Sequence, residues 1–228
     1  MIPIRDHNPS HRFPIVTTTI IGLNVLVFIY QLLFPGDLET FFYTYGLVPC
    51  AVTGQCYGIA GSLSPWLTLF TAMFMHGGWL HIISNMLYLW IFGNNIEDAT
   101  GPIGFLIFYL LCGLAASAAQ IATDPGSTIV NVGASGAIAG VLGAYLVTFP
   151  HARVDTLVIL GWFVRLVTLP AILVLGAWFV LQLFSGVASL AVTTAEGGVA
   201  YFAHLGGFVA GVVLVFLFKR RDYTPISY

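Results

Sequence analysis

Four polar side chains in a strongly apolar chain have the types and spacing that acyl-transfer chemistry requires. They lie in the segments NVGASGAIAG, AHLGG and HGGWLHIISN, and are Ser135, His204, His81 and Asn85. A serine hydroxyl becomes a good nucleophile when a nearby base removes its proton, and histidine is the usual base. Backbone N–H groups at a helix start, with donors on His81 and Asn85, can bind the developing oxyanion. We therefore predict that Ser135 and His204 form a catalytic pair.

Each of these residues also has a structural explanation. Ser135 could cap a helix, which is a common role for serine at a helix start. His204 could be a core histidine that bonds to the backbone. We expect a dyad without an orienting carboxylate, because the acidic residues in the same half of the membrane all lie in loops. These acids are Asp37, Glu39, Asp124 and Glu196.

The elements that must position these side chains are membrane helices. Of the 228 residues, 58% are hydrophobic and 7% are charged. The mean hydropathy is +0.94, which is outside the range of soluble domains. A net charge of −2 with seven Lys and Arg argues against nucleic acid as a partner. Cys50, Cys56 and Cys112 lack the spacing of a zinc site, so we expect no structural zinc.

Six apolar stretches are candidates to cross a bilayer as helices. They cover residues 14–34, 79–93, 102–123, 135–149, 167–190 and 198–218. We interpret the first as a retained span rather than a signal peptide. With both termini in the cytoplasm, all seven basic residues fall on the cytoplasmic side, as the positive-inside rule requires. Residues 153–166 fit either a cytoplasmic interfacial stretch or the start of the fifth span.

This topology predicts an all-α membrane domain over residues 14–218, with cytoplasmic tails at residues 1–13 and 219–228. The second, fourth and sixth spans then run in the same direction. Ser135, His204, His81 and Asn85 should all lie within roughly 10 Å of the outer hydrocarbon boundary, at 1.5 Å of rise per residue. The fourth span is short, so we expect it to begin below the membrane surface beside a wet cavity. The site should open to the outer face.

Two further features concern packing. The first outer loop, roughly residues 35–78, is apolar enough to form short interfacial helices, and its Cys50 and Cys56 either form a disulfide or remain free thiols. Small-residue faces let membrane helices approach closely, which would bring the fourth and sixth spans together and His204 to Ser135. Packing alone would also explain these glycines, which are Gly136, Gly140 and Gly143 on the fourth span and Gly207 and Gly211 on the sixth.

At these residues the chain resembles the rhomboid family of intramembrane serine proteases. The matching motifs are HGGWLHIISN, GASG and AHLGGFVAG, in the family's order, and YGLVP and GNNIED extend the resemblance to roughly residues 43–218. The resemblance implies a six-helix rhomboid-like bundle with a partly helical first outer loop. It implies cleavage of single-span membrane proteins in or near their transmembrane segments, without a metal or cofactor.

The resemblance also implies roles for individual residues. Ser135 would attack, and His204 would act as general base and acid. His81, Asn85 and the backbone N–H of Ser135 would bind the oxyanion. Supporting positions would be His76, Gly133, Gly136, Gly207 and Gly211. The partners would be the lipid bilayer and transmembrane substrates with small residues at the cut. We expect the membrane to be a prokaryotic plasma membrane. The oligomeric state is left open.

The chain departs from the family pattern at two places. Many members have an aromatic residue four positions after the serine that packs on the catalytic histidine, whereas this chain has Ala139. Another group must therefore orient His204. Many members also carry Trp-Arg in the first outer loop, where this chain has Trp66 and Leu67.

Three other functions remain alternatives. A transporter or channel would need polar residues along a route through the membrane, whereas here they gather near one face. A zinc protease using His76, His81 and His204 would lack both the HExxH motif and a carboxylate at that depth. A non-catalytic adaptor would bind membrane helices without cleaving them. For a protease, the apolar span 167–190 and the first outer loop are the candidate gates for substrate.

Overall fold

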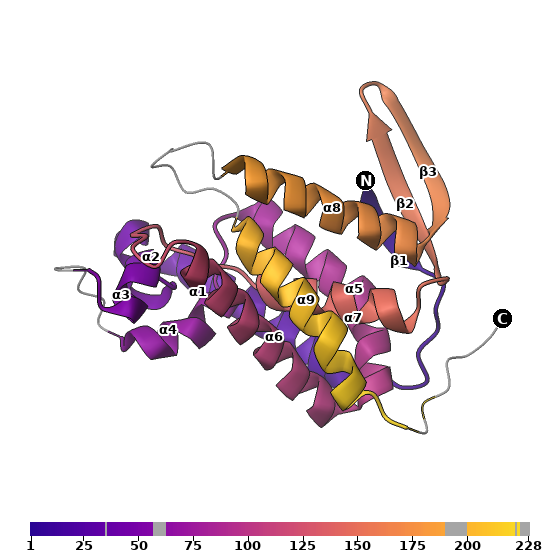
Figure 1. Cartoon of the computed structure of the whole chain (residues 1–228), viewed down its shortest axis with the longest axis horizontal. Coiled ribbons are helices and arrows are strands. Elements are labelled where there is room, and N and C mark those ends of the chain that lie inside the picture. The colour runs from indigo at the N-terminus through magenta and orange to yellow at the C-terminus, as the bar shows by residue number, and fades with distance from the viewer. Residues whose placement is uncertain (35, 57–62, 190–199, 222, 224–228) are drawn as a thin grey trace.

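The computed structural model describes residues 1–34, 36–56, 63–189, 200–221 and 223. Its helices form a bundle with a small β-sheet at one side (Figure 1). The long helices are α1 Ile15–Leu33, α5 Trp79–Thr100, α6 Pro102–Thr123, α7 Ser135–Thr148, α8 Ala171–Ser189 and α9 Tyr201–Phe218. The short ones are α2 Leu38–Tyr45, α3 Pro49–Thr53, α4 Pro65–Thr71 and η1 Ala72–Phe74. The strands are β1 Ile2–Asp6, β2 Arg153–Leu160 and β3 Phe163–Pro170.

Each predicted span coincides with one long helix. Among the described residues, α1, α6, α8 and α9 are long and apolar enough to cross a membrane. The helix α7 has only 14 residues, and α5 ends in polar residues, so the count of six spans stays a prediction. The chain is nevertheless mostly helical and rich in apolar helices, as an integral membrane protein requires.

Helix α5 continues to Thr100, beyond the predicted end of its span at residue 93. The extension is stable because its polar side chains are buried and bonded. The carboxylate of Glu97 accepts hydrogen bonds from the backbone N–H groups of Val16 and Thr17. Since α1 has no side-chain cap of its own, Glu97 satisfies two of its unpaired N–H groups. This contact explains why acids occur at the end of an apolar helix.

Helix α7 lies at the centre of the bundle, and every residue from Gly136 to Tyr145 is buried. It packs closely against α9 through glycines on both helices. A Cβ atom added at Gly207 would overlap the backbone oxygen of Gly136, and one added at Gly211 would overlap that of Gly140. The predicted close approach of these two helices is therefore confirmed.

The expectation of an all-α protein is wrong, because three strands form an antiparallel sheet in the order β1-β2-β3. Strand β1 lies within the predicted N-terminal tail, and β2 and β3 form a hairpin where we expected an interfacial stretch or the start of the fifth span. Helix α8 accordingly begins at Ala171 rather than at residue 167. The hairpin projects from the bundle beside α8 (Figure 1).

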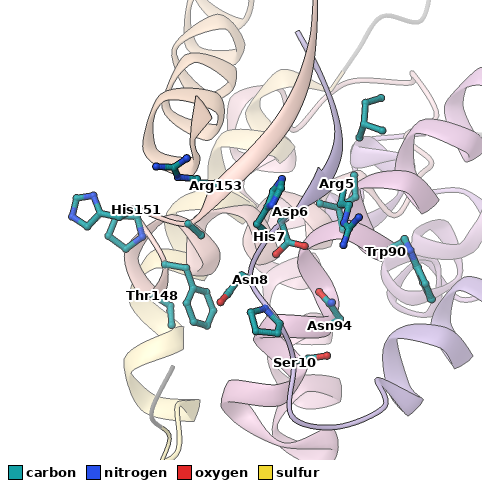
Figure 2. Close-up of a pocket in the computed structure, with 16 residues that line it drawn as sticks. Arg5, Asp6, His7, Asn8, Ser10, Trp90, Asn94, Thr148, His151 and Arg153 are labelled. Atoms are coloured by element: carbon teal, nitrogen blue, oxygen red, sulfur yellow. The ribbon is translucent and has the colours of Figure 1, made fainter. Parts of the chain in front are cut away.

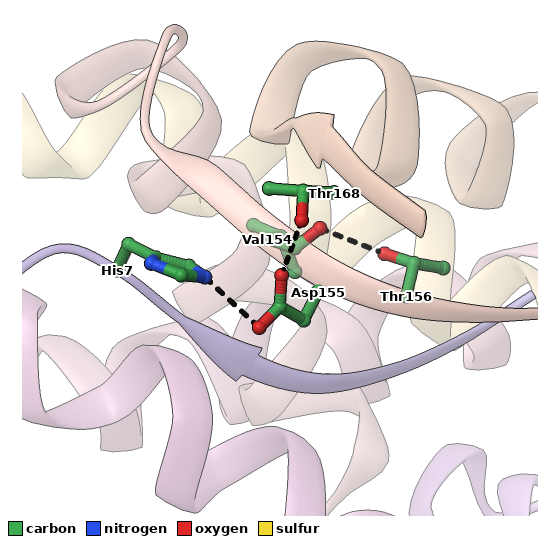
Figure 3. Close-up of polar contacts among 5 residues, drawn as sticks. All are labelled: His7, Val154, Asp155, Thr156 and Thr168. Carbon is green, nitrogen blue, oxygen red and sulfur yellow. Dashed lines mark hydrogen bonds and ion pairs between the residues drawn. The ribbon is translucent and has the colours of Figure 1, made fainter. Parts of the chain in front are cut away.

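Alternation along β2 explains this sheet. Val154 and Thr156 are fully buried, whereas Asp155, between them, points the other way, as successive residues in a strand do. On that face Asp155 accepts a hydrogen bond from Thr168 Oγ1 at 2.6 Å and lies 2.9 Å from Nε2 of His7 (Figure 3). The contact ties the residue after β1 to the β2–β3 hairpin.

The first outer loop contains short helices, as predicted. Helices α2, α3 and α4 gather at the end of the bundle where α7 begins (Figure 1). Cys50 and Cys56 form a disulfide, which settles the two alternatives for these thiols. The backbone N–H of Gly133 donates to the carbonyl of Ala72 at 2.8 Å, so the loop is tied to the segment that leads into α7.

Candidate active site

Ser135 and His204 face each other between α7 and α9. Ser135 is the first residue of α7, and His204 lies in the first turn of α9. The Nε2 atom of His204 is 2.7 Å from Ser135 Oγ, a distance at which an imidazole can accept the hydroxyl proton. The cap position of α7 is Ala134, and no side chain caps the helix. The alternative explanation of Ser135 as a helix cap is therefore wrong.

The other ring nitrogen of His204 contacts a residue that the sequence analysis missed. Nδ1 lies 2.7 Å from Oε1 of Gln182 on α8. One turn earlier on α8, the ring of Trp178 lies 5.9 Å from the His204 ring, at an interplanar angle of 37°. Both ring nitrogens of His204 thus contact side chains rather than the backbone. A polar residue in the middle of an apolar span was the available signal for Gln182.

His81 presents an N–H group towards Gly133, two residues before the serine. The backbone N–H of Gly77 donates to Nδ1 of His81 at 3.2 Å, so the neutral ring carries its proton on Nε2. That atom lies against Gly133, where an added Cβ would be 2.8 Å from it. Gly133 has φ +129°, a conformation that favours glycine. The glycine of GASG therefore serves both the backbone turn and the close approach of His81.

Asn85 and His76 complete this side of the site. Asn85 is 6% exposed, and its Nδ2 atom has no hydrogen-bond partner among the described residues. Buried donors are normally paired, so a free amide in a residue that lines the same cavity as Ser135 is suited to bind an oxyanion. His76 is fully buried and packs edge-on against His81, with ring centroids 5.1 Å apart. It contacts the ring of His81, and the structure does not bring it to Ser135.

Two cavities adjoin the serine. The larger, about 970 Å³, is lined by Trp79 and Tyr88 of α5 and by Trp178 of α8, together with Ser135 and His204. The smaller, about 40 Å³, is lined by residues of α6 and by the start of α7. Its volume suffices for one water molecule, and its polar lining residues are Ser117, Gln120, Asn131 and Ser135. This site can thus accommodate both a peptide segment and a water.

Another open cavity, of about 1160 Å³, lies near the other end of α7. Figure 2 shows its polar side chains, which come from residues 5–10, from α5 and from residues 148–153. Asp6 accepts a hydrogen bond from Tyr145 at 2.7 Å, and His7 contacts Asp155. These groups hold the sheet against the bundle, and within the described part of the chain no serine hydroxyl or cysteine thiol is hydrogen-bonded to the side chain of Asp6 or His7. The candidate active site is therefore the cavity at Ser135.

The described residues contain no group of three His, Cys, Asp or Glu side chains arranged to hold a metal ion. His204 could join a zinc site only by giving up one of its two contacts, with Ser135 or with Gln182. Among the described residues, the alternative of a zinc protease therefore has no supporting ligand set.

Comparison with known proteins identifies the family of this chain. A model of the rhomboid domain matches residues 63–221. Rhomboid-like protein 11, chloroplastic, from Arabidopsis thaliana is 32% identical over 162 residues, which cover 68% of this chain and 53% of the relative. Rhomboid protease GluP from Bacillus subtilis is 40% identical over 81 residues, covering 36% of this chain and 15% of the relative.

Rhomboid protein 1, mitochondrial, from Saccharomyces cerevisiae is 29% identical over 153 residues, covering 64% of this chain and 40% of the relative. The chain spans about half or less of the length of these curated relatives. Some carry chloroplast or mitochondrial names, so a prokaryotic plasma membrane stays a prediction. The matched residues include Ser135, His204, His81 and Asn85 and more than half of the chain. The chain therefore belongs to the rhomboid family.

Proposed function

We propose that this chain is an intramembrane serine protease with a Ser135–His204 dyad. The observation that carries the proposal is the 2.7 Å contact between Ser135 Oγ and His204 Nε2. In the proposed reaction, Nε2 takes the hydroxyl proton while Oγ attacks the scissile carbonyl carbon. His204 then gives this proton to the leaving amine, and the acyl-enzyme is hydrolysed by water with His204 again as base.

The oxyanion of the tetrahedral intermediate would lie between three donors. These are the backbone N–H of Ser135, the Nε2–H of His81 and the amide of Asn85. Support comes from the hydrogen bond of Gly77 to His81, which leaves the proton on Nε2, and from the unpaired Asn85 amide. Donors that are already in place stabilise developing charge without reorganisation.

The proposed substrates are single-span membrane proteins whose transmembrane segment passes between α5 and α8. The cavity at Ser135 supports this route, because aromatic residues of both helices line it. A covalent cross-link between α5 and α8 should then block cleavage of a transmembrane reporter but spare labelling of Ser135 by a small phosphonate. Unimpaired cleavage by the cross-linked protein would refute this route.

The experiment that tests the dyad measures cleavage of a single-span reporter by purified protein in liposomes, with and without a chelator. Ser135→Ala and His204→Ala should each lower kcat by at least about 10³-fold, and the chelator should have no effect. The matched controls are Ser189→Ala and His151→Ala, both at exposed positions, which should cleave like the wild type. If Ser135→Ala cleaves normally, the proposal is wrong. If the wild type neither cleaves nor reacts with a fluorophosphonate at Ser135, the chain is a non-catalytic adaptor.

A further inference from the structure

The imidazole of His204 can act as a base towards Ser135 only in one tautomer and one orientation. Nε2 must be unprotonated and must face Oγ, which requires the ring proton on Nδ1. In serine proteases with a triad, a carboxylate accepts a hydrogen bond from this N–H group and holds the ring. Among the described residues no carboxylate contacts His204, and its titratable neighbour is His81. Some other acceptor must select the tautomer.

Gln182 occupies the place of that acceptor. Its Oε1 atom lies 2.7 Å from Nδ1, on the opposite side of the ring from Ser135. An amide oxygen only accepts hydrogen bonds, so this contact requires a proton on Nδ1 and leaves the lone pair of Nε2 for the serine. The reversed amide would place an N–H group against Nδ1 and force the proton onto Nε2.

Trp178 restrains the same ring from another direction. Residues four apart lie on one face of a helix, so Trp178 and Gln182 both reach His204 from α8. The indole lies 5.9 Å from the imidazole. On α7, the residue four after Ser135 is Ala139, which is too small to make this contact. Helix α8 therefore provides the orienting groups that α7 lacks.

We propose that Gln182 is a positioning residue of the active site, which accepts a hydrogen bond from Nδ1–H of His204 and thereby holds Nε2 ready to deprotonate Ser135. The inference rests on the proposed function. The acceptor comes from α8, which also borders the cavity proposed to hold the substrate. His204 is correctly oriented only while α8 remains packed against α9.

The test compares the wild type with Gln182→Leu and Gln182→Glu in the full chain in liposomes. The control is Leu181→Ala, since Leu181 is adjacent on α8 and 60% exposed. Two readouts are used at several pH values, namely reporter cleavage and the rate at which a fluorophosphonate labels Ser135. Thermal unfolding verifies that each variant is folded.

Gln182→Leu should lower kcat and the labelling rate by about 10- to 100-fold with little change in KM, since it removes the acceptor while a leucine of similar size still lines the cavity. Gln182→Glu should recover most of this loss, and the acidic limb of its pH profile should move to higher pH, because a carboxylate stabilises the imidazolium. Leu181→Ala should behave like the wild type.

The inference is overturned if Gln182→Leu matches Leu181→Ala, or if Gln182→Glu is as slow as Gln182→Leu. A purely structural role for Gln182 would lower both readouts without recovery by glutamate. Failure of the proposed function gives a different result, in which the wild type itself neither cleaves nor is labelled at Ser135.

Discussion

Replacing Gly211 by alanine should separate α7 from α9 and disable the site from a distance. The added Cβ would lie 2.6 Å from the Cα atom of Gly140 and overlap its backbone oxygen. Backbone atoms cannot rotate away, so the helices must move apart by about 1.5 Å for the added Cβ to reach ordinary van der Waals contact with that oxygen. The same shift would stretch the 2.7 Å contact between Ser135 and His204 beyond hydrogen-bond distance.

The expected cost has two parts. Overpacking a well-packed interface lowers the free energy of unfolding by about 1–3 kcal/mol. A displacement of about 1 Å in a catalytic group can reduce the rate about 10²-fold. The first part is measured by thermal unfolding in detergent and the second by the rate at which a fluorophosphonate labels Ser135.

The matched control is Gly176→Ala on α8, where an added Cβ would meet no atom within 4 Å. It should leave both quantities unchanged. If Gly211→Ala unfolds and labels like Gly176→Ala, the close packing of α7 and α9 does not position the dyad, and our explanation of the glycines fails.

Two further predictions concern Asn85 and Asp6. Asn85→Ala should reduce kcat by about 10²- to 10³-fold with little change in KM, measured by reporter cleavage; an equal rise in KM instead would indicate a role in substrate binding. Burial raises the pKa of Asp6 to about 6 despite its hydrogen bond from Tyr145. The folded carboxyl then keeps its proton where the unfolded one, with a pKa of 3.8, has lost it, so Asp6 should make the protein less stable as the pH rises from about 4 to 6. Asp6→Asn should remove this part of the pH dependence of Tm. If Tm still falls as steeply between about pH 4 and 6, the pKa of Asp6 is not the cause.

The sequence was sufficient to locate the helices and most of the candidate site. Apolar stretches of membrane-spanning length have few alternatives to helix, because unpaired backbone groups are costly in lipid. The same cost makes each polar residue at membrane depth conspicuous, which is how Ser135, His204, His81 and Asn85 were found. The glycine faces of α7 and α9 predicted which helices meet.

The sheet could not be predicted in this way. Strand β1 pairs with β2, in a register that places Ile2 opposite Leu157, and nothing near either segment specifies such a distant partner. The apolar, β-branched run in residues 153–170 also fits an interfacial segment or a span, because periodicity alone does not separate these for short apolar runs. The interaction of Glu97 with the start of α1 could not be predicted for the same reason, because its partners are also far away in the sequence.

The sequence by itself determined that this is a helical membrane protein with a serine and a histidine at one depth. Only the tertiary structure decided what orients that histidine. Helix α8 is apolar on nearly all sides, so its composition does not indicate which side faces the bundle. Its packing against α9 selects the side that carries Trp178 and Gln182, and the resulting contact with His204 is a property of that packing.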